Sequence, residues 1–153
     1  MVKEIERKFL VNNLPHVLSR FQSRELLQGY IPHTKEIEER LRMDGNRYFH
    51  TFKSKDRANR EESEEEISAF EFERLWPLTT TTVEKVRYQI PHGDVTIELD
   101  IYYGNLQGLV TAEVEFTNER RARNFVPPIW FGKEVTYEEK YKNRILAEKG
   151  YPE

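Results

Sequence analysis

The beginning of the chain alternates between charged and mostly apolar side chains, which is the pattern of a β-strand. The even-numbered positions carry Glu4, Glu6 and Lys8, and the odd-numbered positions carry Ile5, Arg7, Phe9 and Val11; each set is called a parity of the strand. Because successive side chains of a strand point to opposite faces, two carboxylates and one ammonium share a face. Such a face can hold a metal ion and a phosphate together. Taken alone, it also fits an ordinary solvated strand edge.

The same alternation recurs along the chain and predicts about eight strands in all. Further strand patterns are found over 26–31, 37–43, 47–54, 61–67, 83–90, 95–101 and 110–116. The segments 47–54 and 61–67 fit less cleanly, and 61–67 is acidic on both parities. Gly29 marks a bulge or a close backbone approach in its strand. Acidic side chains dominate the first and the late strands, whereas Arg and Lys dominate the middle ones.

Short helices are expected around these strands. They are predicted over 15–21, over 69–76 with Ser68 as N-cap, over 119–125 with Asn118 as N-cap, and over 137–149 with Gly150 as C-terminal stop. Strands and helices do not alternate as in βαβ units. The sequence therefore predicts an α+β fold of mainly antiparallel β structure. We expect a closed eight-stranded antiparallel β-barrel with a few flanking helices, in one domain spanning residues 1–153.

Closure of the sheet would bring charged side chains together on two facing walls. The acidic wall would contain Glu4, Glu6, Glu98, Asp100, Glu113 and Glu115, and the basic wall Arg40, Arg42, Lys53, Lys85 and Arg87. Neighbouring carboxylates repel each other unless a cation lies between them, and hard oxygen ligands select Mg²⁺ or Mn²⁺. The basic wall would neutralise a polyanion that carries several adjacent charges.

Composition excludes several other classes of function. Of 153 residues, 33% are charged and 37% are hydrophobic, a low hydrophobic share that fits a folded domain only if its interior is partly polar. The net charge of −3 argues against general nucleic-acid binding, and the absence of cysteine excludes disulfides and thiol nucleophiles. Phosphate-loop, Gly-x-Ser-x-Gly and His-Glu-x-x-His motifs are absent. Without a signal peptide or an apolar run of membrane-spanning length, a cytoplasmic protein is the expectation.

The ordered set of charged motifs resembles the CYTH domain family, also called triphosphate tunnel metalloenzymes. The motifs are Glu4-Ile5-Glu6-Arg7-Lys8, Arg40-Leu41-Arg42, Phe52-Lys53-Ser54, Glu84-Lys85-Val86-Arg87, Glu98-Leu99-Asp100 and Glu113-Val114-Glu115. The segment from Trp130 to Asn143 is similar to the short bacterial members. The resemblance implies an antiparallel barrel whose open tunnel binds a triphosphate and a divalent metal. Known activities of the family include inorganic, thiamine and RNA triphosphatases and class IV adenylate cyclase, so the fold does not choose the substrate.

The resemblance also implies roles for individual residues. Glu4, Glu6, Asp100, Glu113 and Glu115 resemble the metal side, and Lys8, Arg40, Arg42, Lys53, Lys85 and Arg87 resemble the phosphate side. Lys142, with Lys140, would reach one tunnel mouth from the C-terminal helix. Glu62, Glu64 and Glu98 resemble lumenal acids of open role, and a slip of one residue would turn Glu62 and Glu64 outward.

The expected reaction is metal-dependent hydrolysis of a triphosphate, by in-line attack of water on a terminal phosphoryl group. Glu6, Lys8 or Lys85 could accept the proton, and the sequence does not rank them, although a plain phosphate clamp is the simpler role for Lys8. No aromatic constellation specifies a purine or thiamine ring, which favours inorganic tripolyphosphate as the small-molecule substrate. The alternatives are a class IV type adenylate cyclase and a non-catalytic polyphosphate or nucleotide sensor. The resemblance is compatible with a homodimer, and the sequence leaves the oligomeric state open.

Overall fold

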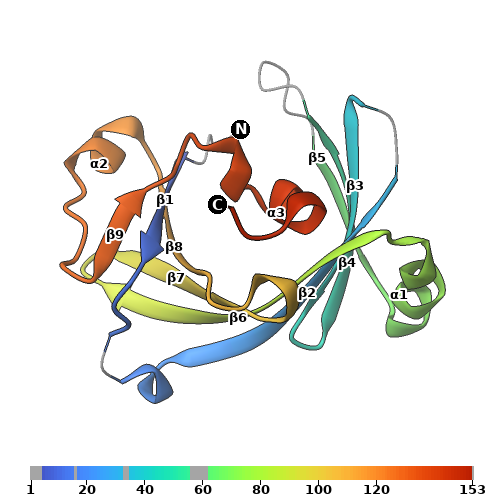
Figure 1. Cartoon of the computed structure of the whole chain (residues 1–153), viewed down its shortest axis with the longest axis horizontal. Helices are drawn as coiled ribbons and strands as arrows, with labels where there is room; N and C mark the ends of the chain where they lie inside the picture. Colours follow the sequence, from blue (N-terminus) through green and yellow to red (C-terminus); the bar gives the residue numbers. More distant parts are fainter. Residues whose placement is uncertain (1–4, 16, 33–34, 56–61, 153) are drawn as a thin grey trace.

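The structure, a computed structural model, describes residues 5–15, 17–32, 35–55 and 62–152, so the candidate ligand Glu4 lies outside the described residues. Its strands are β1 (Ile5–Val11), β2 (Gln22–Ile31), β3 (Ile37–Asp44), β4 (Arg47–Ser54), β5 (Glu62–Ile67), β6 (Thr81–His92), β7 (Val95–Tyr102), β8 (Val110–Phe116) and β9 (Phe131–Glu134). They form one antiparallel sheet in the order β5-β4-β3-β2-β6-β7-β8-β1-β9. The sheet curves into a trough (Figure 1).

Three α-helices and four 3₁₀ turns accompany the described part of the sheet. The helices are α1 (Ala69–Leu75), α2 (Glu119–Asn124) and α3 (Asn143–Lys149), and the turns are η1 (Leu18–Arg20), η2 (Trp76–Leu78), η3 (Gly104–Leu106) and η4 (Glu139–Tyr141). Both predicted N-caps are confirmed, because Ser68 Oγ accepts a hydrogen bond from Glu71 N and Asn118 Oδ1 accepts one from Arg121 N. The expected helix over 137–149 is divided into η4 and α3. None of the described helices is long and apolar enough to cross a membrane.

The sheet differs from the prediction at its two edges. Within the described residues it has nine strands where eight were predicted, because the short β9, Phe131-Gly132-Lys133-Glu134, lacks the alternation that marks the other strands. Closure of the barrel is not confirmed, since β5 and β9 are the two edges and no pairing within the described residues joins them. Adjacent carboxylates on β5 at Glu64, Glu65 and Glu66 repel one another and discourage pairing with a further strand.

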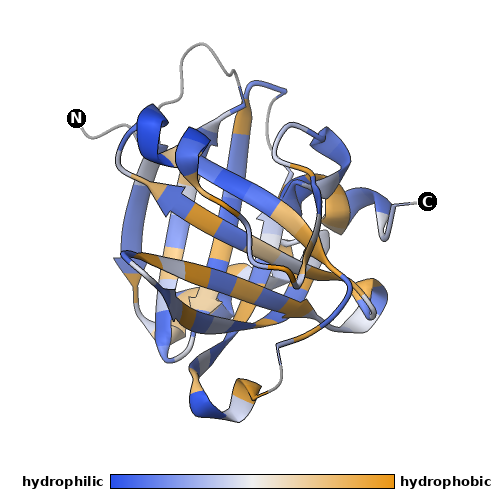
Figure 2. Ribbon diagram, turned by 90° about the vertical axis from the view of Figure 1, so that its left-hand side faces the viewer, coloured by the Kyte–Doolittle hydropathy of each residue, from blue (hydrophilic) through white to orange (hydrophobic). Residues whose placement is uncertain are grey.

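The convex face of the sheet carries the main apolar core. Ile97, Leu99, Ala112 and Val114 are fully buried there and pack with Ala122 of α2. Hydrophobic and hydrophilic residues alternate along the strands (Figure 2). Gly29 confirms the predicted close approach, because a Cβ at this position would lie 2.6 Å from atoms of Trp76 and Thr79. This face is therefore occupied by permanent packing.

A second apolar cluster lies on the concave face, at one end of the trough. Its members are Tyr30, Val83, Tyr102, Leu106, Leu109, Val135, Tyr141 and Leu146. Tyr30, Val83 and Tyr102 come from the sheet, and Leu146 comes from α3, which lies over the concave side between β1 and β3 (Figure 1). The trough thus has an apolar end covered by α3 and an opposite end that is polar.

Candidate active site

The strand register brings the predicted charged residues of the sheet to the concave face. Directly opposite pairs are Glu6 with Glu115, Lys8 with Glu113, Glu98 with Glu113, Arg87 with Asp100, Arg40 with Thr51, and Lys53 with Glu62. Because the side-chain period of a strand is two, these residues share one face while their neighbours enter the convex core. The described members of the predicted site on the sheet therefore share its concave face, and this charged part of the concave face is called the groove below.

Asp100 organises the buried cations at the centre of the groove. Its two oxygens accept hydrogen bonds from Arg87 Nε (2.7 Å) and Nη2 (2.9 Å). Lys85 Nζ lies 2.8 Å from Asp100 Oδ2, and both side chains are 0% exposed. Burial alone would raise the pKa of Asp100, but the charges of Lys85 and Arg87 hold it well below its usual value. Asp100 thus forms ion pairs with two cations, and its role as a metal ligand stays a prediction.

Two cationic nitrogens in the groove retain unused hydrogen-bonding capacity. Among the described residues, neither Lys85 Nζ nor Arg40 Nε has a hydrogen-bond partner of regular geometry, although both atoms are buried. Burial lowers the pKa of Lys85 to about 8, and the charge of Asp100 opposes this shift. Buried donors normally find acceptors, so these two nitrogens suit the oxygens of a phosphate chain.

Arg42 is supported by a glutamine that the sequence analysis did not single out. Arg42 Nε donates to Gln28 Oε1 (3.0 Å), and Gln28 Nε2 donates to Tyr30 Oη (3.0 Å). Burial, followed by the charges of Arg40 and Arg87, lowers the pKa of Arg42 to about 10. Gln28 shares its parity with Leu26 and Tyr30, and only the register of β2 with β3 places it directly opposite Arg42.

Glu6 shows that the acidic and basic walls influence each other. Burial and then the negative charge of Glu113 raise the pKa of Glu6 to about 7, while Lys8 and, from the distant strand β4, Lys53 lower it. A cation bound nearby would stabilise the ionised form of this carboxylate. Across 5–15, 17–32, 35–55 and 62–152, no three His, Asp or Glu side chains form a chelating group by themselves. The donors nevertheless fit Mg²⁺ or Mn²⁺, because Mg²⁺ keeps waters and takes substrate oxygens beside one or two carboxylates.

Lys8 links the groove to the C-terminal segment. Its Nζ donates to the carbonyl oxygen of Tyr141 (2.6 Å) and lies 3.6 Å from Glu113 Oε1. An ammonium has three donors, so Lys8 can also bind a phosphate oxygen. The carbonyl of Tyr141 is a backbone group, and side-chain patterns gave no signal for it.

Glu62 and Glu64 face the groove, which settles their register. Thr51 Oγ1 donates to Glu64 Oε1 (3.1 Å), and Arg40 Nη2 lies 3.9 Å from Glu62 Oε1 and 4.0 Å from Glu64 Oε1. Both carboxylates therefore sit beside Arg40 and orient it toward the groove.

The C-terminal lysines are arranged differently from the lysines of the sheet. Lys142 Nζ lies 3.1 Å from Glu139 Oε1, and Lys140 Nζ lies 3.8 Å from Glu138 Oε1. Their side chains are 39% and 49% exposed, whereas that of Lys85 is 0% exposed. Both lysines form ion pairs within their own segment, so the structure does not bring them into the cluster around Asp100.

Comparison with known proteins agrees with this geometry. The model of the CYTH domain family matches residues 2–145. An inorganic triphosphatase of Nitrosomonas europaea is 46% identical over 94% of this chain and 96% of its own length, and one of Acetivibrio thermocellus is 32% identical over 99% and 97%. A crystal structure described as an inorganic triphosphatase has a TM-score of 0.77 at 45% identity, covering 96% of this chain and 95% of that one.

A structure from Hippeastrum, described as a putative adenylyl cyclase with a dominant triphosphatase activity, covers 79% of this chain and 83% of its own at 16% identity, with a TM-score of 0.59. At that identity it shares the fold alone. The family model spans nearly the whole described chain, and the charged groove contains the motifs on which the resemblance was based. The chain belongs to the CYTH domain family.

Proposed function

We propose that this protein hydrolyses inorganic tripolyphosphate to pyrophosphate and phosphate, with Mg²⁺ or Mn²⁺ as the divalent cation. The observation that carries the proposal is that buried Lys85 and Arg87 and half-buried Arg42 share the concave face of the sheet with the carboxylate of Glu6. Cations alone would suffice to bind a polyanion. The added acidic wall favours an enzyme over a sensor, and the names of the similar bacterial proteins support the same substrate.

The phosphate chain is bound by the basic side of the groove. Arg40, Arg42, Lys53, Lys85 and Arg87 supply the positive charge, and Lys8 adds an ammonium beside the acidic wall. The fixed positions of Arg87 and Lys85 follow from their contacts with Asp100. Such preorganised donors stabilise the charge that the transferring phosphoryl group carries in the transition state.

The cation would be held by one or two of the carboxylates of Glu6, Glu113 and Glu115, with substrate oxygens and water completing its coordination. When bound, it neutralises phosphate charge and lowers the pKa of water. These three carboxylates lie on paired strands, because Glu6 is opposite Glu115 and Glu113 is two residues away from it on β8.

Proton transfer is assigned to Lys85. Of the three candidate groups, Glu6 is committed to the cation, and Lys8 already donates to Tyr141. Burial lowers the pKa of Lys85 to about 8, so a useful fraction is neutral in mildly alkaline solution. One water attacks a terminal phosphorus, the phosphoanhydride bond breaks, and one proton leaves, which gives pyrophosphate and phosphate.

The decisive experiment is product analysis with tripolyphosphate, ATP and thiamine triphosphate in parallel, each with Mg²⁺, Mn²⁺ or EDTA. We expect cation-dependent phosphate release from tripolyphosphate well above the other substrates, and its loss in Glu6→Ala. Glu73→Ala, an exposed carboxylate of α1, is the control. Formation of cyclic AMP and pyrophosphate from ATP would identify a cyclase, and tight binding without turnover would identify a sensor.

A further inference from the structure

One end of the groove is closed by residues 139–149, which comprise η4 and α3 and are named the end cap. Leu146 of the end cap is 1% exposed and packs with Tyr30, Val83 and Tyr102 of the sheet. Lys85 Nζ lies 5.2 Å from the ring centroid of Tyr102, so this apolar packing begins directly beside a buried cation of the groove. A phosphate chain that extends in this direction therefore meets side chains, not solvent.

Three polar contacts fix the end cap to three different strands. The Tyr141 carbonyl accepts from Lys8 Nζ of β1 (2.6 Å), and Asn143 Oδ1 accepts from Tyr102 Oη of β7 (2.8 Å). Arg144 Nε lies 3.3 Å from Glu38 Oε1 of β3. The end cap thus spans the groove from wall to wall.

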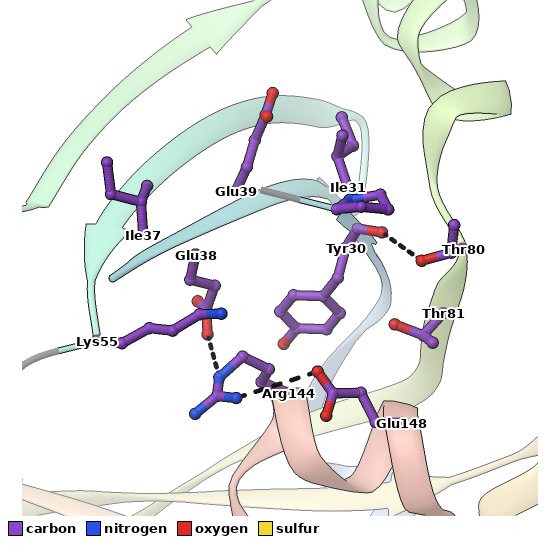
Figure 3. A pocket seen from close by; sticks show the side chains of 11 residues that line it. Tyr30, Ile31, Ile37, Glu38, Glu39, Lys55, Thr80, Thr81, Arg144 and Glu148 are labelled. Atoms are coloured by element: carbon purple, nitrogen blue, oxygen red, sulfur yellow. Dashed lines mark hydrogen bonds and ion pairs between the residues drawn. The ribbon is translucent and has the colours of Figure 1, made fainter. Parts of the chain in front are cut away.

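A cavity of about 220 Å³ lies beside the end cap (Figure 3). Its charged lining consists of three carboxylates and two cations, Glu38, Glu39, Glu148, Lys55 and Arg144, and the ring of Tyr30 also lines it. Arg144 lies between the two carboxylates, 3.3 Å from Glu38 and 4.0 Å from Glu148. The cavity has room for a phosphoryl group, but its carboxylates repel that group and already neutralise its guanidinium.

The opposite end of the groove disfavours additional phosphoryl groups for an electrostatic reason. Glu98 lies on that side, and Arg24 there forms an ion pair with Asp44. An additional phosphoryl group at this end would face the carboxylate of Glu98 and an arginine that is already paired.

We propose that the end cap restricts the substrate to tripolyphosphate and excludes longer linear polyphosphates, with Leu146 as the specificity-determining residue. This inference rests on the proposed function. Leu146 holds Tyr30 and Tyr102 against the end of the groove, and shortening it lets these rings move away from the phosphate chain. The end cap disfavours longer polyphosphates by steric contact at this end of the groove. The carboxylates of the adjoining cavity disfavour them by electrostatic repulsion.

The test compares tetrapolyphosphate with tripolyphosphate, by kcat/KM and by calorimetric binding in EDTA. For the wild type we expect values about tenfold poorer for tetrapolyphosphate. Leu146→Ala should raise the ratio of tetrapolyphosphate to tripolyphosphate by about fivefold. Glu148→Gln changes a half-exposed side chain and is expected to fold, so it should raise the ratio by about twofold even if Leu146→Ala is unstable.

Leu99→Ala is the matched control, because it removes the same atoms from a fully buried site on the convex face. Its ratio should equal that of the wild type. Equal use of the two substrates by the wild type, an unchanged ratio in both end-cap variants, or the same rise in Leu99→Ala would overturn the proposal. Since the binding comparison needs no turnover, a failure of the proposed hydrolysis is distinguished from a failure of the length restriction.

Discussion

Leu99 and Asp100 are neighbours on β7, yet they belong to two regions with different requirements. Leu99 points to the convex face, where it packs against other apolar side chains of the protein. Asp100 points to the groove, where it holds Arg87 and Lys85 in a buried position. Convex packing is complete without a ligand, whereas Lys85 Nζ and Arg40 Nε are buried in the groove with donors left over. One face of the sheet therefore provides stability, and the other is built for a polyanion.

Asp100→Asn and Leu99→Ala give the strongest test of this division. Asp100→Asn leaves two buried cations without their counter-ion, so we expect a loss of about 3–5 kcal/mol in the free energy of unfolding. Leu99→Ala leaves a cavity and should cost about 2–5 kcal/mol. Only Asp100→Asn should also lower the activity per folded molecule, because Arg87 and Lys85 lose their fixed positions.

Urea unfolding measures both losses, and initial rates on tripolyphosphate are then corrected for the folded fraction. If the two variants retained the same corrected activity, the assignment of the two faces to different tasks would be wrong.

Arg7 and Lys8 offer a comparison on β1. Lys8→Ala removes a groove ammonium, and loss of one transition-state donor should lower kcat/KM by about 10²–10³-fold. Arg7→Ala removes ion pairs with Glu134 and hydrogen bonds to the carbonyls of Ala122 and Phe125 on the convex side. It should cost about 1.5–3 kcal/mol in stability and leave corrected kcat/KM unchanged. Similar kinetic losses in both variants would contradict the comparison.

The division into two faces could be predicted from the sequence, because alternation along a strand encodes it directly. Most strands were predicted for this reason, although β2 begins at Gln22 and not at residue 26, and the two helix N-caps follow from the side chains of Ser68 and Asn118. The edges were harder, since β9 is short and pairs through its backbone with β1. Closure also depends on how strongly a sheet curves, and the residue pattern of single strands does not encode curvature.

The candidate site, like the fold, could be predicted from the sequence only in part. Charged residues on the groove parity could be located from the sequence, but their pairing could not. The ion pairs of Asp100 with Lys85 and Arg87 follow from the pairing of β6 with β7, which the sequence of β7 alone does not show. The carbonyl of Tyr141, which accepts from Lys8, is invisible to any argument from side chains.

Glu6 predicts a dependence of stability on pH that the convex face does not share. Its folded pKa of about 7 lies above the reference value of 4.5, so the folded state binds more protons between these two pH values. The free energy of unfolding should therefore fall as the pH rises from about 4.5 through about 7 in EDTA, and Mg²⁺ should reduce this fall. Thermal unfolding over this range checks it, with Glu73→Gln as a control that keeps the wild-type slope.

In Glu6→Gln the fall should be smaller, because the amide does not titrate. An identical pH profile in Glu6→Gln and the wild type would show that Glu6 ionises freely, and the acidic wall would then lack the repulsion that calls for a cation.

The smallest effect is expected at the edge strand β5, where the neighbouring residues Glu64 and Glu65 point to opposite faces of the sheet. Glu64 is 43% exposed and 4.0 Å from Arg40, so solvent screens the pair and Glu64→Gln should change kcat/KM by less than about threefold, which corresponds to well under 1 kcal/mol. Glu65→Gln, on the other parity, should leave kcat/KM unchanged. If Glu65→Gln had the larger effect, the register of β5 would differ by one residue, and the groove would lose the carboxylates that orient Arg40.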